Sequence, residues 1–150
     1  MKKFEFSVEK LRRYQQQKLR LAELEIQRAR MVLDQSVAEL QAIRCKFDDI
    51  AKTRHSDMEN DQHLTHACQD VMRQLQADID QAILVVKENE IRLKELAEVG
   101  TVERIKSESY EVLRANEKSE HQTETAKSEM LELSETIMRT WAEKQGGSEA

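Results

Sequence analysis

Apolar residues between positions 19 and 50 recur with the seven-residue period of a coiled coil. One set repeats every seven residues, and a second set lies three residues after each member of the first. The two sets are Leu19, Ile26, Leu33, Leu40 and Phe47, and Ala22, Ala29, Ser36, Ile43 and Ile50. They occupy the a and d positions of a helix that buries one narrow stripe. Because one helix cannot cover such a stripe alone, the pattern predicts a partner helix.

The first helix is predicted to run from about residue 8 to about residue 54. Ser7 is a residue type that caps helix N-termini, and Phe6 and Leu11 have the spacing of a hydrophobic staple around that cap. The seam residues that precede the regular repeat are separated by steps of three, four and four, namely Val8, Leu11, Gln15 and Leu19. This spacing predicts a stutter, a local unwinding of the coil, before the regular repeat begins.

A polar stretch separates this helix from the next apolar repeat. Residues 52–62 are almost wholly polar, and Ser56 with Glu59 forms a capping box, so we predict a turn at about 55–62. A second helix then extends from about 63 to about 144. Its seam residues are Met72, Ile79, Val86 and Leu93, and Leu75, Ala82, Asn89 and Leu96. Asn89 is a polar residue in an apolar seam, a feature that fixes the register of coiled coils.

Gly100-Thr101 is an alternative position for the turn. Glycine just after one helix and threonine just before the next are common end signals. A turn there would leave half of a very long first helix without a partner, whereas the earlier turn pairs residues 19–50 with residues 72–96. We therefore favour the earlier turn. Gly100 is then a weak point or kink, because glycine inside a helix costs about 1 kcal/mol relative to alanine.

The last third of the chain changes from polar to amphipathic. Residues 114–125 are polar on every face, as expected of a helix that has no partner. Apolar residues then return on one face, namely Ala126, Met130, Leu133, Ile137 and Trp141. The predicted fold is all-α, an antiparallel two-helix coiled-coil hairpin with an overhanging C-terminal helix. Residues 1–150 form a single coiled-coil domain in this interpretation.

The composition favours long helices over a wide globular core. The 150 residues include no proline, three glycines and 4% aromatic residues, and 35% of them are charged. Residues 1–55 carry 13 Lys/Arg against 8 Asp/Glu, a balance of +5, and residues 56–150 carry 11 against 21, a balance of −10. The opposite signs favour pairing of the two helices, although an exposed ion pair contributes only about 0–1 kcal/mol.

The sequence indicates neither membrane insertion nor a disulfide framework. The longest apolar run, Ala82–Val86, is far shorter than the roughly 20 residues that span a bilayer, and no signal peptide is recognisable. Cys45 and Cys68 both fall within predicted helices. A chain of this kind fits a reducing, cytoplasmic location.

We expect no metal site in this chain. His63, His66 and Cys68 are close together, but a zinc site needs about four ligands, and only the two histidines share a helix face. An alternating acidic run resembles the start of a calcium loop but lacks that loop's glycine and its bidentate glutamate. The acidic run consists of Asp57, Glu59 and Asp61.

Enzymatic and nucleic-acid-binding functions are also disfavoured. The three glycines, at 100, 146 and 147, cannot form a phosphate-binding loop, and a two-helix rod has no pocket to exclude water. We therefore expect no catalysis and no cofactor. The first helix is basic, but Glu9, Glu23 and Glu25 interrupt its positive charge, so a solvated flank is favoured over a nucleic-acid surface.

The N-terminal sequence resembles the start of the FliJ family, the coiled-coil components of the bacterial flagellar export apparatus. Many members begin with Lys-Phe-x-Phe, an aliphatic residue, a lysine and a tyrosine, and continue into a charged helix. The matching residues are Phe4, Phe6, Val8, Lys10, Leu11 and Tyr14. The likeness covers about the first thirty residues by motif and the remainder by helical layout.

This resemblance implies a non-catalytic stalk protein of type III secretion, located in the cytoplasm and peripherally associated with the export apparatus at the inner membrane. The implied partners are the hexameric flagellar export ATPase, whose pore receives the end of the rod, the export gate protein FlhA, and export chaperones. The residues expected at the ATPase end are Phe4, Phe6, Leu11, Tyr14, Met130, Leu133, Ile137 and Trp141. Those expected at the gate are Val71, Met72, Leu75 and Ile79.

Other interpretations of these residues remain open. The four gate residues also fit simple packing in the seam. The apolar face ending at Trp141 has the character of a binding surface, but it could instead fold back onto the Phe4, Phe6 and Leu11 end or mediate self-association. The alternative function is therefore a self-associating coiled-coil scaffold or a chaperone-like holdase.

Overall fold

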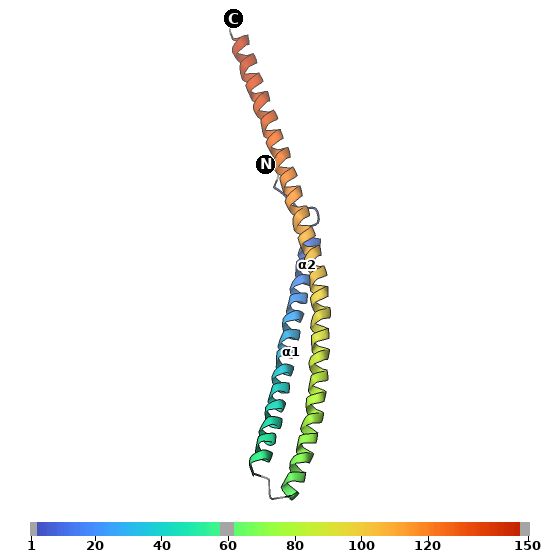
Figure 1. Cartoon of the computed structure of the whole chain (residues 1–150). Helices are drawn as coiled ribbons and strands as arrows, with labels where there is room; N and C mark the ends of the chain where they lie inside the picture. Colours follow the sequence, from blue (N-terminus) through green and yellow to red (C-terminus); the bar gives the residue numbers. More distant parts are fainter. Residues whose placement is uncertain (1–2, 58–61, 148–150) are drawn as a thin grey trace. The chain divides into compact units, whose positions relative to one another are not determined.

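The computed structural model describes residues 3–57 and 62–147, and these contain two long helices (Figure 1). Helix α1 spans Glu9–Asp57 and helix α2 spans Gln62–Gly146. No strand occurs in these two ranges, so the described chain is all-helical. Within the predicted turn, residues 58–61 lie outside the described residues, as does Glu59 of the predicted capping box. The alternative turn at Gly100-Thr101 is wrong, because α2 continues through both residues.

The contacts divide the chain into two units, and each contains part of both helices. The hairpin unit comprises residues 18–103, and the terminal unit comprises residues 1–17 and 104–150.

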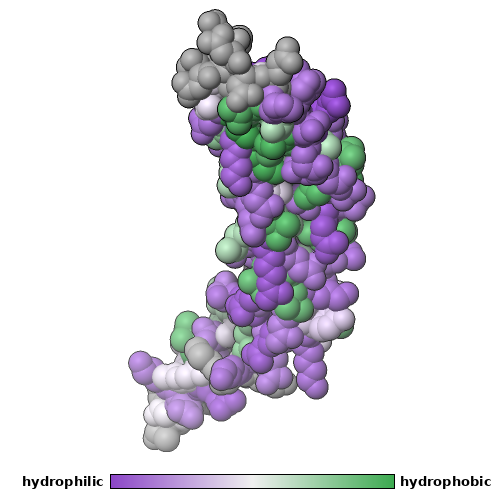
Figure 2. Space-filling view, turned by 90° about the horizontal axis from the view of Figure 1, so that it is seen from below, coloured by the Kyte–Doolittle hydropathy of each residue, from purple (hydrophilic) through white to green (hydrophobic). Residues whose placement is uncertain are grey.

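The apolar seam predicted for the hairpin unit is confirmed by burial. Each of the ten a and d residues between 19 and 50 is buried or half-buried, as is each of the eight between 72 and 96. Leu40 is 8% exposed and Ile79 7%, whereas Met31 on the outer face of α1 is 71% exposed. Hydrophobic residues accordingly appear as narrow patches between hydrophilic flanks (Figure 2). The period-3.5 pattern is buried because only a second helix covers a stripe of that width.

The two helices of the hairpin unit are antiparallel. The side chain of Ile26 on α1 lies against the backbone of Gly100 on α2. Farther along α1, Ile43 lines a groove together with Ala82. As the residue number rises along α1, the number of the neighbouring residue on α2 falls, which is the arrangement of a helical hairpin.

Regular heptads continue into the N-terminal part of α1, so the predicted stutter is wrong. Val8, Arg12 and Gln15 are covered there at steps of four and three, with Glu9 and Gln16 half-buried beside them. Leu11, which the stutter required in the seam, is 51% exposed. The reason is that the Arg12 side chain pairs with a carboxylate on each helix. Because Arg12 occupies the seam, the neighbouring Leu11 points toward solvent.

Helix α2 carries a polar continuation of its seam in the terminal unit. Arg114, Glu117 and His121 are half-buried, so the expectation that residues 114–125 are unpaired on every face is wrong. These residues are polar because residues of the N-terminal segment contact them, as Ser7 contacts Glu117, and not because this part of α2 lacks a partner. In contrast, every residue from 126 to 147 is exposed.

Candidate partner-binding site

A charged cluster joins the N-terminal part of α1 to α2 within the terminal unit. Arg12 Nη2 donates to Glu9 Oε1 at 2.6 Å, and Arg12 Nη1 donates to Glu111 Oε1 at 2.7 Å. The Arg12 side chain is 15% exposed, while that of Glu111 is 44% exposed. Gln16 Nε2 also donates to Glu111 Oε1, at 3.1 Å. Arg12 therefore bridges a carboxylate of its own helix and a carboxylate of the other helix.

The charges in this cluster change the acidity of their partners. Hydrogen bonds from Arg12, and to a lesser degree from Arg13, lower the pKa of Glu9 from 4.5 to about 2, although partial burial acts in the opposite direction. The hydrogen bonds to Glu9 and then to Glu111 raise the pKa of Arg12. Both groups are charged throughout the neutral range, so the contacts form between a guanidinium and two carboxylates.

Ser7 contacts α2 and does not cap α1, contrary to the sequence prediction. Its hydroxyl Oγ donates to Glu117 Oε1 at 2.8 Å, and its backbone amide donates to Glu117 Oε2 at 3.3 Å. The first helical hydrogen bond of α1 runs from the Arg12 amide to the Val8 carbonyl oxygen, at 2.9 Å. The sequence motif for a cap was present, but a carboxylate on the facing helix bonds the serine instead.

The aromatic residues at the N-terminus also lie within this contact. The Phe4 and His121 rings meet edge to face, with centroids 5.6 Å apart and planes at 60°. Phe6 is 8% exposed and is the buried apolar residue among those described in the terminal unit. Because Leu11 is half exposed, the predicted staple does not account for the burial of Phe6.

One donor in the cluster lacks a hydrogen bond. Arg114 Nε is buried without a hydrogen-bond partner, and its nearest ion-pair atom is Glu9 Oε2 at 3.9 Å. An open groove of about 450 Å³ lies beside it. The groove is lined by Phe4, Glu5, Phe6, Glu9, Lys10, Arg13 and Arg114. The cluster is thus incompletely satisfied, which costs stability relative to a fully paired network.

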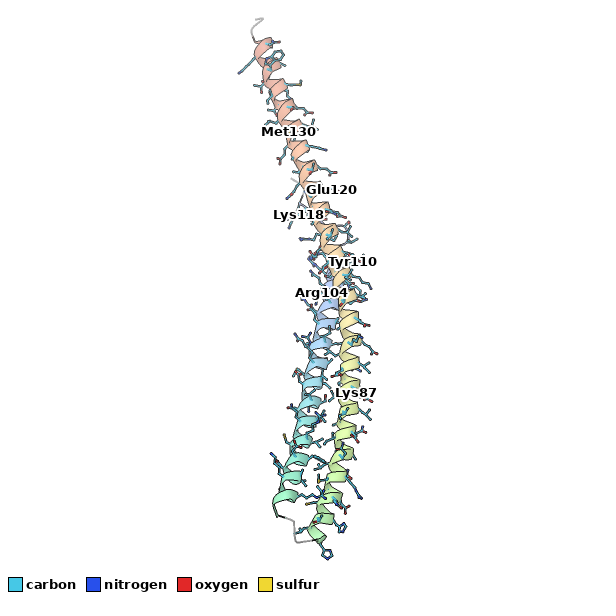
Figure 3. The ribbon with its side chains drawn as sticks, viewed as in Figure 1. Lys87, Arg104, Tyr110, Lys118, Glu120 and Met130 are labelled. Carbon is cyan, nitrogen blue, oxygen red and sulfur yellow. The ribbon has the colours of Figure 1, made fainter. Side chains whose placement is uncertain are left out.

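The apolar face near the end of α2 is exposed to solvent. Met130 is 71% exposed, Leu133 65%, Ile137 61% and Trp141 64%. Two further large apolar residues missed by the sequence interpretation, Leu131 and Met138, extend this surface around the helix. We call the six residues the C-terminal apolar face. Figure 3 labels Met130 on this stretch, where side chains project from all sides of the ribbon.

The eight residues predicted for the ATPase end do not form one surface. Phe4 and Phe6 pack in the contact between the N-terminal residues and α2. Leu11 and Tyr14 are 51% and 57% exposed on α1. The remaining four belong to the C-terminal apolar face.

Three of the four predicted gate residues lie in the hairpin seam. Ile79 is 7% exposed, and Met72 and Leu75 are half-buried. Only Val71, at 46% exposure, presents a large part of its side chain to solvent. Their arrangement is that of seam packing, the alternative left open by the sequence.

The side chains considered as metal ligands are not grouped into a site where the structure describes them, and some lie outside the described residues. His63 and His66 are exposed and Cys68 is half-buried. Glu59 and Asp61 lie outside the described residues. Within residues 3–57 and 62–147, no three His, Cys, Asp or Glu side chains are grouped to hold a metal ion. In the same ranges, neither helix has a stretch long and apolar enough to cross a membrane.

Comparison with known proteins yields no relative. No family model matches the chain, and neither a curated protein nor a solved structure matches it. The likeness to the FliJ family therefore rests on the N-terminal motif and remains a prediction.

Proposed function

We propose that this chain is a non-catalytic stalk protein of the flagellar type III export apparatus, which binds the export ATPase ring through the C-terminal apolar face. The observation that supports this proposal is the exposure of six large apolar residues on one stretch of helix. Surfaces of this size with a tryptophan are typical of partner-binding sites. An amphipathic helix of this kind docks by inserting its apolar residues into a groove of the partner.

In this proposal, the end of α2 overhangs the hairpin and is the part that enters the ring. The exposure of residues 126–147 leaves this stretch of α2 available to a partner, and the apolar seam of residues 19–50 stabilises the hairpin unit. The gate protein FlhA and export chaperones are further proposed partners, by resemblance to the FliJ family. The proposed location is the cytoplasm, at the periphery of the export apparatus on the inner membrane.

A pull-down with the hexameric flagellar export ATPase tests the proposal. The variant Ile137→Ala with Trp141→Ala truncates two of the six residues of the C-terminal apolar face, including its tryptophan, and we expect it to abolish ATPase binding without loss of helicity. A matched control is Glu132→Ala with Arg139→Ala, because helical spacing places both residues on the opposite side of α2. Unchanged binding by the apolar variant would remove this site.

The same exposed face also fits the second candidate, a self-associating scaffold or holdase. Six uncovered apolar residues would be buried by a second copy as readily as by a ring. Sedimentation of the purified chain separates the two functions. A monomer that binds the ATPase supports the stalk, whereas a stable tetramer dissociated by the Ile137→Ala, Trp141→Ala variant supports the scaffold.

A further inference from the structure

We propose that residues 3–17 form a clasp that detaches from α2 as ionic strength rises, while the hairpin unit stays folded. We call these residues the N-terminal clasp. The proposal concerns the terminal unit alone and holds whether or not the chain is an export stalk. It rests on three properties of the contact between the clasp and α2, which are its polarity, its shortage of apolar burial and its incomplete hydrogen bonding.

The contacts that hold the clasp on α2 are polar and accessible to salt. Ser7 bonds Glu117 in an exposed position, and Arg12 bonds a Glu111 side chain that is 44% exposed. The Arg12–Glu111 pair is open to solvent on its Glu111 side, while the Arg12 side chain is 15% exposed, so dissolved ions screen this pair in part. Raising the salt concentration therefore weakens the attachment of the clasp selectively.

Apolar burial, which salt does not screen, contributes little to the clasp. In the described part of the terminal unit the buried residues are Phe6, Gln15 and Ser107, and two of these three are polar. Among the described residues of the hairpin unit, the buried side chains are the apolar Ala29, Leu40 and Ile79 together with the polar Ser36. The hydrophobic effect thus holds the hairpin unit together and leaves the clasp dependent on charge.

Some ion pairs of the cluster join the clasp to α2, namely Arg12–Glu111 and Glu9–Arg114, while Arg12–Glu9 and Arg13–Glu9 lie within the clasp. Arg12 bonds both Glu9 within the clasp and Glu111 on α2. Of these two pairs, only Arg12–Glu111 joins the clasp to α2, because Glu9 and Arg12 are three residues apart on one helix. Opening also hydrates Arg114 Nε, which has no hydrogen-bond partner in the closed state. Both features favour local opening over unfolding of the whole chain.

Hydrogen exchange of the full chain, read by mass spectrometry at two salt concentrations, tests this proposal. The concentrations are about 0.01 M and about 1 M, between which the Debye length falls from about 30 Å to about 3 Å. We expect amides 12–17 to exchange about three- to tenfold faster at high salt, the factor for loss of one or two exposed ion pairs. We expect amides 22–50 to change less than about twofold, because their burial is apolar.

Two variants show whether the link to α2 is responsible. Glu111→Gln removes the carboxylate on α2 and leaves the Glu9–Arg12 pair within the clasp intact, so it should give the high-salt exchange of amides 12–17 already at low salt. Arg13→Met is the matched control, because Arg13 is 74% exposed and its ion pair with Glu9 lies within α1.

Three outcomes would overturn the proposal. The first is exchange of amides 12–17 that does not respond to salt. The second is equal acceleration in residues 12–17 and 22–50, which would mean that the two units open together. The third is an Arg13→Met variant that opens the clasp as much as Glu111→Gln does, since the link to α2 would then be irrelevant.

Discussion

Ile26 Cδ1 lies 2.7 Å from the position that a Cβ atom would occupy on Gly100. Gly100 is buried inside the continuous helix α2, seven residues beyond the seam residue Leu93. The glycine therefore continues the seam and admits the Ile26 side chain between the helices. It is not the turn that its sequence context suggested, because α2 continues through it; its lack of a Cβ leaves room for the Ile26 side chain, which would have to shift if a Cβ were added.

The first prediction follows from that contact. Gly100→Leu should destabilise the protein by up to about 2 kcal/mol, since overpacking costs about 1–3 kcal/mol and the gain in helix propensity returns about 1 kcal/mol. The measurement is the urea midpoint followed by circular dichroism. Gly146→Leu is the control, because no heavy atom lies within 4 Å of a Cβ there. Equal midpoints for the two variants would contradict the role assigned to Gly100.

A second prediction concerns the seam of the hairpin unit. Leu40→Ala should lower the free energy of unfolding by about 2–5 kcal/mol, because Leu40 is 8% exposed and truncation leaves a cavity. Met31→Ala removes a comparable side chain that is 71% exposed, and its effect should be within about 0.5 kcal/mol. Thermal unfolding of both variants checks the difference. A large effect of Met31→Ala would indicate that the outer face of α1 is covered in solution.

A third prediction concerns pH and follows from the lowered pKa of Glu9. Its carboxylate should titrate at about pH 2 in the folded chain, while in the unfolded chain it titrates at about 4.5. Between these values the unfolded state binds a proton that the folded state does not. The stabilising contribution of Glu9 is therefore complete above pH 4.5 and is lost as the pH falls toward 2.

An NMR titration of the Glu9 side-chain carboxyl measures this midpoint directly. Arg12→Met should move it upward toward 4.5, because Arg12 is the largest cause of the lowered pKa, and Arg13→Met should move it less. The variant Glu9→Gln should show no stability change from this group between pH 4.5 and 2. A wild-type midpoint near 4.5 would mean that the Arg12–Glu9 contact is not formed in solution.

The fourth prediction uses Trp141, the single tryptophan of the chain, as a probe. Because it is 64% exposed, its fluorescence should have the long-wavelength emission of a solvated indole and should be quenched readily by acrylamide. Binding of a partner to the C-terminal apolar face should shift the emission to shorter wavelength. A dilution series of the chain alone is the control, because self-association would produce the same shift only at high concentration.

Part of the candidate site can be predicted from the apolar pattern of the sequence. A further part can be predicted from the heptad register, whatever the hydrophobicity of the residues. Trp141 and its neighbours were identified by helical spacing alone. Arg12 was missed, although it stands seven residues before the seam residue Leu19 and strict heptad counting would have placed it in the seam. Leu11 was chosen instead because an apolar side chain was expected there. Assigning seam positions by hydrophobicity puts Leu11 in the seam, whereas assigning them by heptad register puts Arg12 there.

The sequence by itself determined the two helices and the apolar seam of the hairpin unit. A stripe repeating every 3.5 residues over many heptads can be buried only along a second helix. Its burial therefore does not depend on the contacts that other parts of the chain make. Such a pattern is read from one chain segment at a time. The pattern can therefore be recognised without knowing which residues the partner helix supplies.

Only the tertiary structure decided what lies opposite Ser7 in the terminal unit and opposite Gly100 in the hairpin unit. Ser7 could cap its own helix or bond Glu117, and Gly100 could end a helix or admit Ile26. Local sequence allows both choices in each case, because hydrogen bonds and close contacts depend on the one residue that lies opposite. That residue comes from a distant part of the chain, and its position is known only after the two helices are paired.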